Sequence, residues 1–60
     1  MSEMLDQRET ATMLGISWET LRQKRRKGMG PSWFRLSNNV IRYRRGDVEA
    51  YLESKRVVTA

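Results

Sequence analysis

The sequence of 60 residues contains neither cysteine nor histidine. The lack of cysteine excludes disulfide bonds and thiolate metal ligands, and the lack of histidine excludes imidazole as a metal ligand or general base. Because no apolar run approaches the length of a signal peptide or a membrane span, we expect neither. The fold must therefore depend on side-chain packing alone, and we expect a cytoplasmic protein without a metal or cofactor.

The chain is short and basic. A protein of this length forms at most one domain with a thin core, because folding buries only about 60% of its surface. Lysine and arginine number 12 against 7 acidic residues, which gives a net charge of +5, and nine of the 12 bases are arginine. This balance favours a polyanionic partner such as DNA, RNA or an anionic membrane. The alternative is charge that serves solubility only, but the bases cluster while most acids lie near the ends.

Capping residues predict a first short helix over residues 7–14. Asp6 is a suitable N-cap, and Glu9 three positions later completes a variant of the capping box. Gly15 is a favourable left-handed residue just beyond the last turn. The small side chains of this helix indicate close approach to a second helix.

A second helix is predicted over residues 18–27. Ser17 is its candidate N-cap, Ile16 can pack back against its first turn, and Gly28 follows its end. Two short helices joined by a glycine-containing turn are the helix-turn-helix pattern.

Alternation of apolar and polar residues then predicts a β-hairpin with strands at 33–36 and 40–43 and a turn at Ser37-Asn38-Asn39. We expect its two faces to differ. The inward side chains are predicted to be Phe34, Leu36, Ile41 and Tyr43, and the outward ones Trp33, Arg35, Arg42 and Arg44.

A last helix is predicted from the spacing of Val48, Tyr51, Leu52 and Lys55. The expected fold class is mainly α with a small β-hairpin, in the order helix, helix, hairpin, helix. Residues 1–56 are expected to form this single winged helix-turn-helix domain, and residues 57–60 a frayed tail.

The predicted second helix would place the basic residues from Arg22 to Lys27 on different faces. Leu21 is the only aliphatic anchor and marks the inward direction. The opposite face carries four polar residues at helical spacing, namely Glu19, Arg22, Gln23 and Arg26. Arginine and glutamine pair with guanine and adenine in the major groove, which admits an α-helix. An ordinary solvated face is the alternative.

Each remaining residue of this helix has an expected role. Base-edge contacts are expected from Arg22, Gln23 and Arg26, and phosphate contacts from Ser17, Thr20, Lys24, Arg25 and Lys27. Lys24 and Arg25 are expected to cover apolar surface with their stems while their charged heads reach outward. Trp18 is either a core residue at the rim or a contact to DNA or to a neighbouring protein. Glu19 either accepts from cytosine or pairs within the helix with Arg22 or Gln23.

The hairpin is the second basic element. A hairpin beside a helix-turn-helix is a wing, which can lie on the DNA backbone or enter the minor groove. The wing residues predicted to contact DNA are Arg35, Ser37, Asn38, Asn39, Arg42 and Arg44. The alternatives are a hairpin that only covers the core and tip asparagines that serve only the turn.

The ordered sequence LDQRETATMLGISWETLRQKRRKGMGPSWFRL…VIRYRRGDVEAYL resembles the small excisionase-type, MerR-like winged-helix family over residues 5–53. The matching landmarks are Leu14-Gly15-Ile16-Ser17, Thr20-Leu21, Gly30-Pro31, Arg35-Leu36, Ile41-Arg42-Tyr43, and Arg44-Arg45 followed by Asp47-Val48-Glu49-Ala50-Tyr51-Leu52. The chain departs from this family at Lys24, where relatives often carry an aromatic residue, and at Thr10, where alanine is common. Because the sequence shows no long C-terminal dimerisation helix of the kind found in full MerR regulators, we do not expect ligand-sensing transcriptional control by that mechanism.

The resemblance implies a second helix in the major groove and a hairpin on the adjacent minor groove. It further implies a phage or mobile-element excisionase, or recombination directionality factor, in the bacterial host cytoplasm. Such proteins bind and bend attachment-site DNA and direct a partner integrase toward excision. Because no dimer seam is visible in the sequence, we expect a monomer in solution that assembles head-to-tail along DNA. The rivals are a small transcriptional regulator on the same fold and a protein-binding adaptor that uses Trp18, Trp33 and Val57-Val58. We expect no enzyme, because no nucleophile–base pair or phosphate loop is present.

Overall fold

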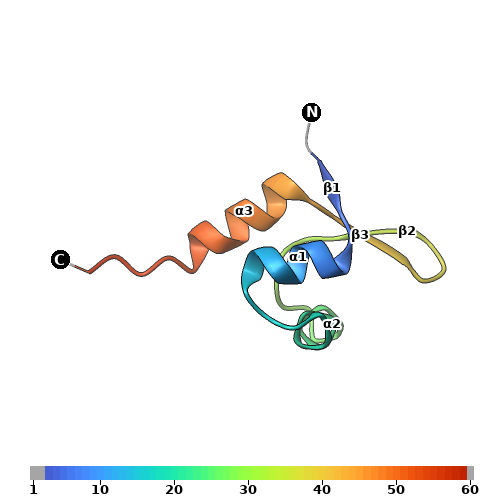
Figure 1. The fold of residues 1–60 in the computed structure, drawn as a ribbon, viewed down its shortest axis with the longest axis horizontal. Helices are drawn as coiled ribbons and strands as arrows, with labels where there is room; N and C mark the ends of the chain where they lie inside the picture. Colours follow the sequence, from blue (N-terminus) through green and yellow to red (C-terminus); the bar gives the residue numbers. More distant parts are fainter. Residues whose placement is uncertain (1–2, 60) are drawn as a thin grey trace.

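Three helices and a small antiparallel sheet make up the protein in the computed structural model, which describes residues 3–59 (Figure 1). The elements in chain order are β1 (Met4–Leu5), α1 (Gln7–Leu14), α2 (Trp18–Arg26), β2 (Phe34–Ser37), β3 (Val40–Arg44) and α3 (Arg45–Ser54). The predicted fold class is confirmed. The limits of the predicted domain and tail at residues 1, 2 and 60 lie outside the described residues.

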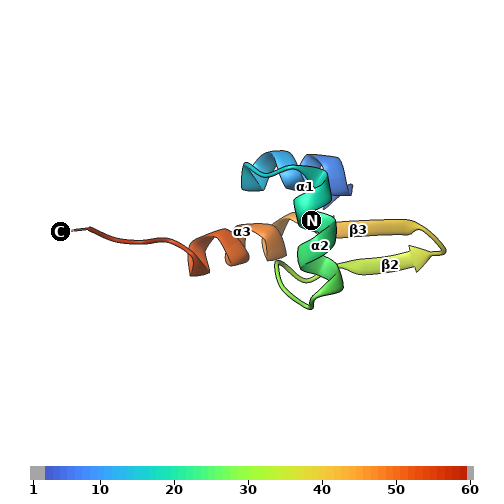
Figure 2. The same cartoon turned by 90° about the horizontal axis from the view of Figure 1, so that it is seen from below.

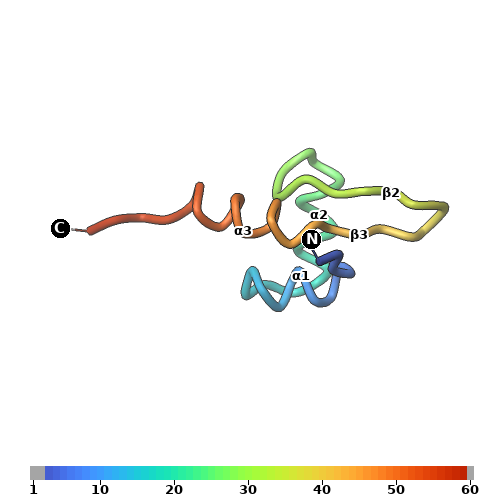
Figure 3. Tube along the Cα trace, turned by 90° about the horizontal axis from the view of Figure 1, so that it is seen from above, coloured from blue at the N-terminus to red at the C-terminus, as the bar shows by residue number. Residues whose placement is uncertain are grey.

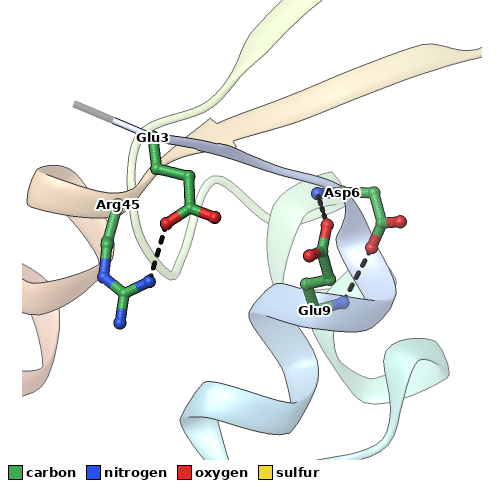
Figure 4. Close-up of polar contacts among 4 residues, drawn as sticks. All are labelled: Glu3, Asp6, Glu9 and Arg45. Atoms are coloured by element: carbon green, nitrogen blue, oxygen red, sulfur yellow. Dashed lines mark hydrogen bonds and ion pairs between the residues drawn. The ribbon is translucent and has the colours of Figure 1, made fainter. Parts of the chain in front are cut away.

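Helix α1 begins and ends where its caps predict. The Asp6 carboxylate accepts a hydrogen bond from the Glu9 backbone N–H at 2.7 Å, and the Glu9 carboxylate accepts one from the Asp6 N–H at 3.1 Å (Figure 4). The helix stops at Gly15, which has a φ of 71°. A side chain at this left-handed φ is strained, so glycine ends the helix at little cost.

Helix α2 follows after a three-residue turn and packs on α1. The Ser17 hydroxyl accepts a hydrogen bond from the Thr20 N–H at 3.2 Å, as expected of an N-cap. Leu21 is 1% exposed, which confirms its predicted inward direction. The helix ends at Arg26, one residue before the predicted end, and Lys27 is its C-cap.

The sheet contains a third strand that the sequence did not predict. In β1, Leu5 pairs with Tyr43 of β3, which gives the strand order β1-β3-β2. Next to it, the Arg45 N–H donates to the Glu3 carbonyl at 2.8 Å, and the two side chains form an ion pair at 2.9 Å (Figure 4). A strand of two residues carries no periodic signal, so it becomes visible only once its partner strand is placed.

Strand β2 turns the opposite face inward from the one predicted, whereas Ile41 and Tyr43 of β3 face the core as predicted. Phe34 is 39% exposed and Leu36 is 62% exposed, so their predicted core positions are wrong. Trp33, which was predicted to face outward, packs against the core instead. Strands β2 and β3 run side by side (Figure 3), and a bulge interrupts their register between Arg35 and Ser37.

The bulge explains the reversal. A two-residue turn at Asn38-Asn39 without a bulge would place Leu36 opposite Ile41. The observed register instead places Arg35 opposite Ile41 and Phe34 opposite Arg42. One extra residue in a strand moves every side chain beyond it to the other face. Arg35 and Arg42, which were predicted to share the outward face, therefore start from opposite faces of the sheet.

The core lies where the helices meet one face of the sheet. Its buried apolar residues are Leu5, Ala11, Leu21, Tyr43 and Val48. Thr10 is also fully buried, and its hydroxyl donates to the Asp6 carbonyl at 2.8 Å, so the hydroxyl is satisfied there. The hairpin projects beyond α1 and α2, and its base lies over α2, whereas α3 extends in the other direction (Figures 1 and 2).

Candidate nucleic-acid interface

An open groove of about 810 Å³ lies between α2 and the hairpin, and the start of α1 closes one side of it. We call it the basic groove. It is lined by Asp6, Gln7 and Arg8 at the start of α1, by Trp18, Arg22, Arg25 and Arg26 of α2, and by Trp33, Arg35, Asn39, Ile41 and Arg42 of the hairpin region.

The basic groove carries six arginines and one carboxylate. The carboxylate belongs to Asp6 and accepts the capping hydrogen bond of α1. Within residues 3–59, none of the six arginines forms an ion pair with an acidic side chain. The three arginines outside the groove all do, in the pairs Arg44–Asp47 at 3.0 Å, Arg45–Glu3 at 2.9 Å and Arg56–Glu53 at 3.2 Å. Positive charge is thus left uncompensated on the concave surface, where it attracts a polyanion.

The polar stripe of α2 has the predicted orientation. Glu19, Arg22, Gln23 and Arg26 are all exposed, opposite buried Leu21. Arg22 and Arg26 line the basic groove, whereas Glu19 and Gln23 do not. No hydrogen bond or ion pair joins Glu19 to Arg22 or Gln23 in the described part of the chain.

The first turn of α2 adds hydroxyl groups and an indole. The Ser17 and Thr20 hydroxyls lie 2.9 Å apart and are exposed, so they remain accessible to a phosphate. Trp18 is half-buried against the core and also lines the groove, with the guanidinium carbon of Arg8 5.6 Å from its ring centroid. Its predicted place at the rim of the core is confirmed, and a contact to DNA stays a prediction.

The basic residues at the margins of α2 differ from one another. Lys27 is exposed and Lys24 is half-buried. The head of Arg25 does not reach outward as predicted. Its Nη1 donates to the Tyr43 hydroxyl at 3.3 Å and to the Gln7 amide oxygen at 3.4 Å, so the guanidinium lies across the inner wall of the groove. Both acceptors are neutral, so the charge of Arg25 is not compensated.

The predicted wing residues separate into two groups. Arg35, Asn39 and Arg42 line the basic groove. The strand register places Arg42 on the opposite face of the sheet from Arg35, but its side chain still lines the basic groove. Its Nη1 donates to the Ile41 carbonyl at 2.8 Å. Asn39 has a φ of 66°, the left-handed conformation predicted for this turn. The exposed residues that do not line the groove are Ser37, Asn38 and Arg44.

Five groove residues were not predicted as DNA-contact residues, namely Asp6, Gln7, Arg8, Trp33 and Ile41. Gln7 and Arg8 belong to the first turn of α1, and Trp33 precedes β2. The helical and strand periodicities describe faces within one element, so they carry no signal for side chains that meet across three elements. Their neighbours Trp18 and Arg35 were predicted, but the approach of α1 to the hairpin depends on the tertiary fold.

Comparisons with known proteins agree with this architecture. A family model described as helix-turn-helix domain matches residues 4–56. No curated protein and no solved structure gave a significant match. Within residues 3–59, no helix has the length and apolar character needed to cross a membrane. The matching family binds DNA and includes excisionase-like proteins. The chain belongs to the helix-turn-helix domain family.

Proposed function

We propose that the protein is a sequence-specific DNA-binding protein that acts as an excisionase. The observation that supports this proposal best is the set of six arginines in the basic groove, none of which pairs with an acidic side chain in the described residues. Duplex DNA presents two phosphate charges per base pair, and arginine donates to phosphate oxygens in a forked geometry. A duplex seated against α2 and the hairpin would provide the missing anionic partners.

In this proposal α2 enters the major groove. Arg22, Gln23 and Arg26 are exposed on its outward face and would contact base edges. Flanking contacts to phosphates would come from Ser17, Thr20, Lys24, Arg25 and Lys27. The buried Leu21 supports this arrangement because it fixes the rotation of α2 about its axis.

The hairpin would contact the backbone and the adjacent minor groove. Arg35, Asn39 and Arg42 are the best placed, since all three line the basic groove. Ser37 and Asn38 would contribute from the tip of the hairpin. Arg44 is the weakest wing candidate because its guanidinium already pairs with Asp47 at 3.0 Å.

The excisionase role adds a biological consequence to DNA binding. Several copies would assemble head-to-tail on attachment-site DNA, bend it and direct a partner integrase toward excision. Support comes from the family, which includes excisionase-like proteins, and from the position of the hairpin beside α2, which allows one protomer to contact two grooves. Contacts in both grooves favour a bent duplex.

A mobility-shift assay with DNA from beside the gene, with and without the nearest integrase, tests the proposal. An excisionase should shift this DNA specifically, increase the amount of integrase complex and slow the migration of fragments whose site lies centrally. Specific binding without any effect on the integrase would favour a transcriptional regulator on the same fold. Deletion of the gene then separates the two roles, since it would change either prophage excision or transcript levels.

A further inference from the structure

Trp33 contacts two arginines at the junction of α2 and the hairpin. The guanidinium carbons of Arg25 from α2 and Arg35 from β2 are each 5.6 Å from the centroid of its ring. The indole is half-buried against the core, which fixes its position. An aromatic ring that contacts two guanidinium groups orients both of them, because guanidinium prefers to lie over the face of a tryptophan.

The two arginines are also held by neighbouring groups in different ways. Arg25 is half-buried, and its contacts to the Tyr43 hydroxyl at 3.3 Å and the Gln7 amide oxygen at 3.4 Å restrict its movement. Arg35 is exposed, and its backbone is fixed by pairing with Ile41. One guanidinium therefore comes from the rigid wall of the groove, and the other comes from the hairpin.

Neither cation has an anionic partner within residues 3–59. Two like charges against one ring repel each other, and a partly buried charge without a counter-ion is costly. An anion that accepts from both guanidinium groups would remove both penalties. A phosphodiester fits because its two unbridged oxygens can accept from two separate forks.

From this geometry we infer that Arg25 and Arg35, oriented by Trp33, form a clamp for a single phosphate of the DNA backbone. The inference rests on the proposed DNA-binding function. The clamp lies between the α2 stripe and the hairpin, so its phosphate belongs to the strand that separates the major groove from the minor groove. Binding of that phosphate fixes α2 and the hairpin in one register on the duplex.

Salt-dependent binding to a short random-sequence duplex tests the clamp. The slope of log K against log salt is negative, and it becomes shallower by about 0.9 for each phosphate contact that is lost. The double variant Arg25→Gln/Arg35→Gln removes two charges but only one phosphate contact, so its slope should become shallower by about 0.9. A matched control removes two charges from outside the groove with Arg45→Gln/Arg56→Gln, and its slope should stay that of the wild type.

Two further variants keep the test decisive if Arg25→Gln impairs folding. The variant Trp33→Phe retains both cations but orients them less well, so affinity should fall while the salt slope is retained. The single variant Arg35→Gln leaves Arg25 on the phosphate, so affinity should fall with a slope change well below 0.9. Circular dichroism confirms that each variant is folded.

The outcomes separate the clamp from the proposed function. If the slope of the double variant became shallower by about 1.8, the two arginines would contact two independent phosphates. An unchanged slope and affinity would mean that neither arginine contacts a phosphate. Either result, with steep binding by the wild type, overturns the clamp alone. Failure of the folded wild type to bind the duplex overturns the DNA-binding function and the clamp together.

Discussion

Arg25 donates a hydrogen bond to the hydroxyl of Tyr43 across 3.3 Å, and this bond joins α2 to the central strand of the sheet. Tyr43 is fully buried, so its hydroxyl needs a partner within the protein. Its ring completes the core, while its hydroxyl reaches the wall of the basic groove. The same residue thus supports the fold and positions a cation of the interface.

This relationship predicts the effect of Tyr43→Phe. The variant keeps the ring but removes the acceptor of the Arg25 hydrogen bond, so the free energy of unfolding should fall by about 1 kcal/mol. Urea denaturation measures the loss. Tyr51→Phe is the matched control, since the Tyr51 hydroxyl has no hydrogen bond within residues 3–59. Equal losses in the two variants would show that the Arg25 bond contributes nothing to stability.

Leu21 should be far more sensitive to truncation than Leu36. Leu21→Ala leaves a cavity under α2 and should cost about 2–5 kcal/mol, which is comparable to the whole stability of a domain of this size. The variant should therefore be largely unfolded by circular dichroism at 25 °C. Leu36→Ala removes the same atoms from an exposed side chain and should change stability by less than about 0.5 kcal/mol. Similar losses at the two positions would contradict the assigned core.

The sequence predicted the parts of the fold that local chemistry decides. The Asp6 and Glu9 capping box and the Ser17 cap set the starts of α1 and α2, and Gly15 sets the end of α1. The direction of Leu21 followed from the helical period alone. These features depend on residues within one turn of each other, so no tertiary information was needed.

The inward face of strand β2 could not be predicted in the same way. The alternation around Phe34 and Leu36 fits either face, and the choice depends on a single bulge residue in the strand register. Strand β1 and the meeting of Arg8 with Trp18 likewise depend on contacts between elements distant in the sequence. The arginines of α2 were therefore predicted as site residues, but the groove that unites them with α1 and the hairpin was not.

Arg22 and Arg26 should carry sequence discrimination. Replacing either with alanine should weaken binding to the cognate site by roughly 1–3 kcal/mol and relax the preference for that site over random DNA. Arg56→Ala is a suitable control, because this arginine pairs with Glu53 outside the groove. Quantitative shift assays on both duplexes give the ratio of affinities. If random and cognate DNA lose affinity equally, the two residues contact phosphates only.

Binding should depend steeply on salt. About five phosphates would be neutralised, one by the Arg25–Arg35 clamp and one each by Arg8, Arg42, Lys24 and Lys27. The slope of log K against log salt should therefore be about −4.5, because each phosphate contact contributes about −0.9. Fluorescence is a direct readout because both tryptophans, Trp18 and Trp33, line the groove. A flat response between about 50 and 200 mM salt would contradict an interface built on these basic residues.

Asn39 allows turn chemistry to be separated from DNA contact. Its φ of 66° is accessible to glycine, so Asn39→Gly should fold as stably as the wild type to within about 0.5 kcal/mol. Asn39→Ala keeps the Cβ in the left-handed region but loses the polar side chain that makes this conformation accessible to asparagine, so it should cost about 1 kcal/mol of stability. If the amide contacts DNA from the groove, Asn39→Gly should also bind more weakly by about 0.5–1.5 kcal/mol, because a hydrogen bond is lost from an intact hairpin. Denaturation and shift assays on the same two variants give both quantities, and wild-type affinity in Asn39→Gly would limit this residue to its turn.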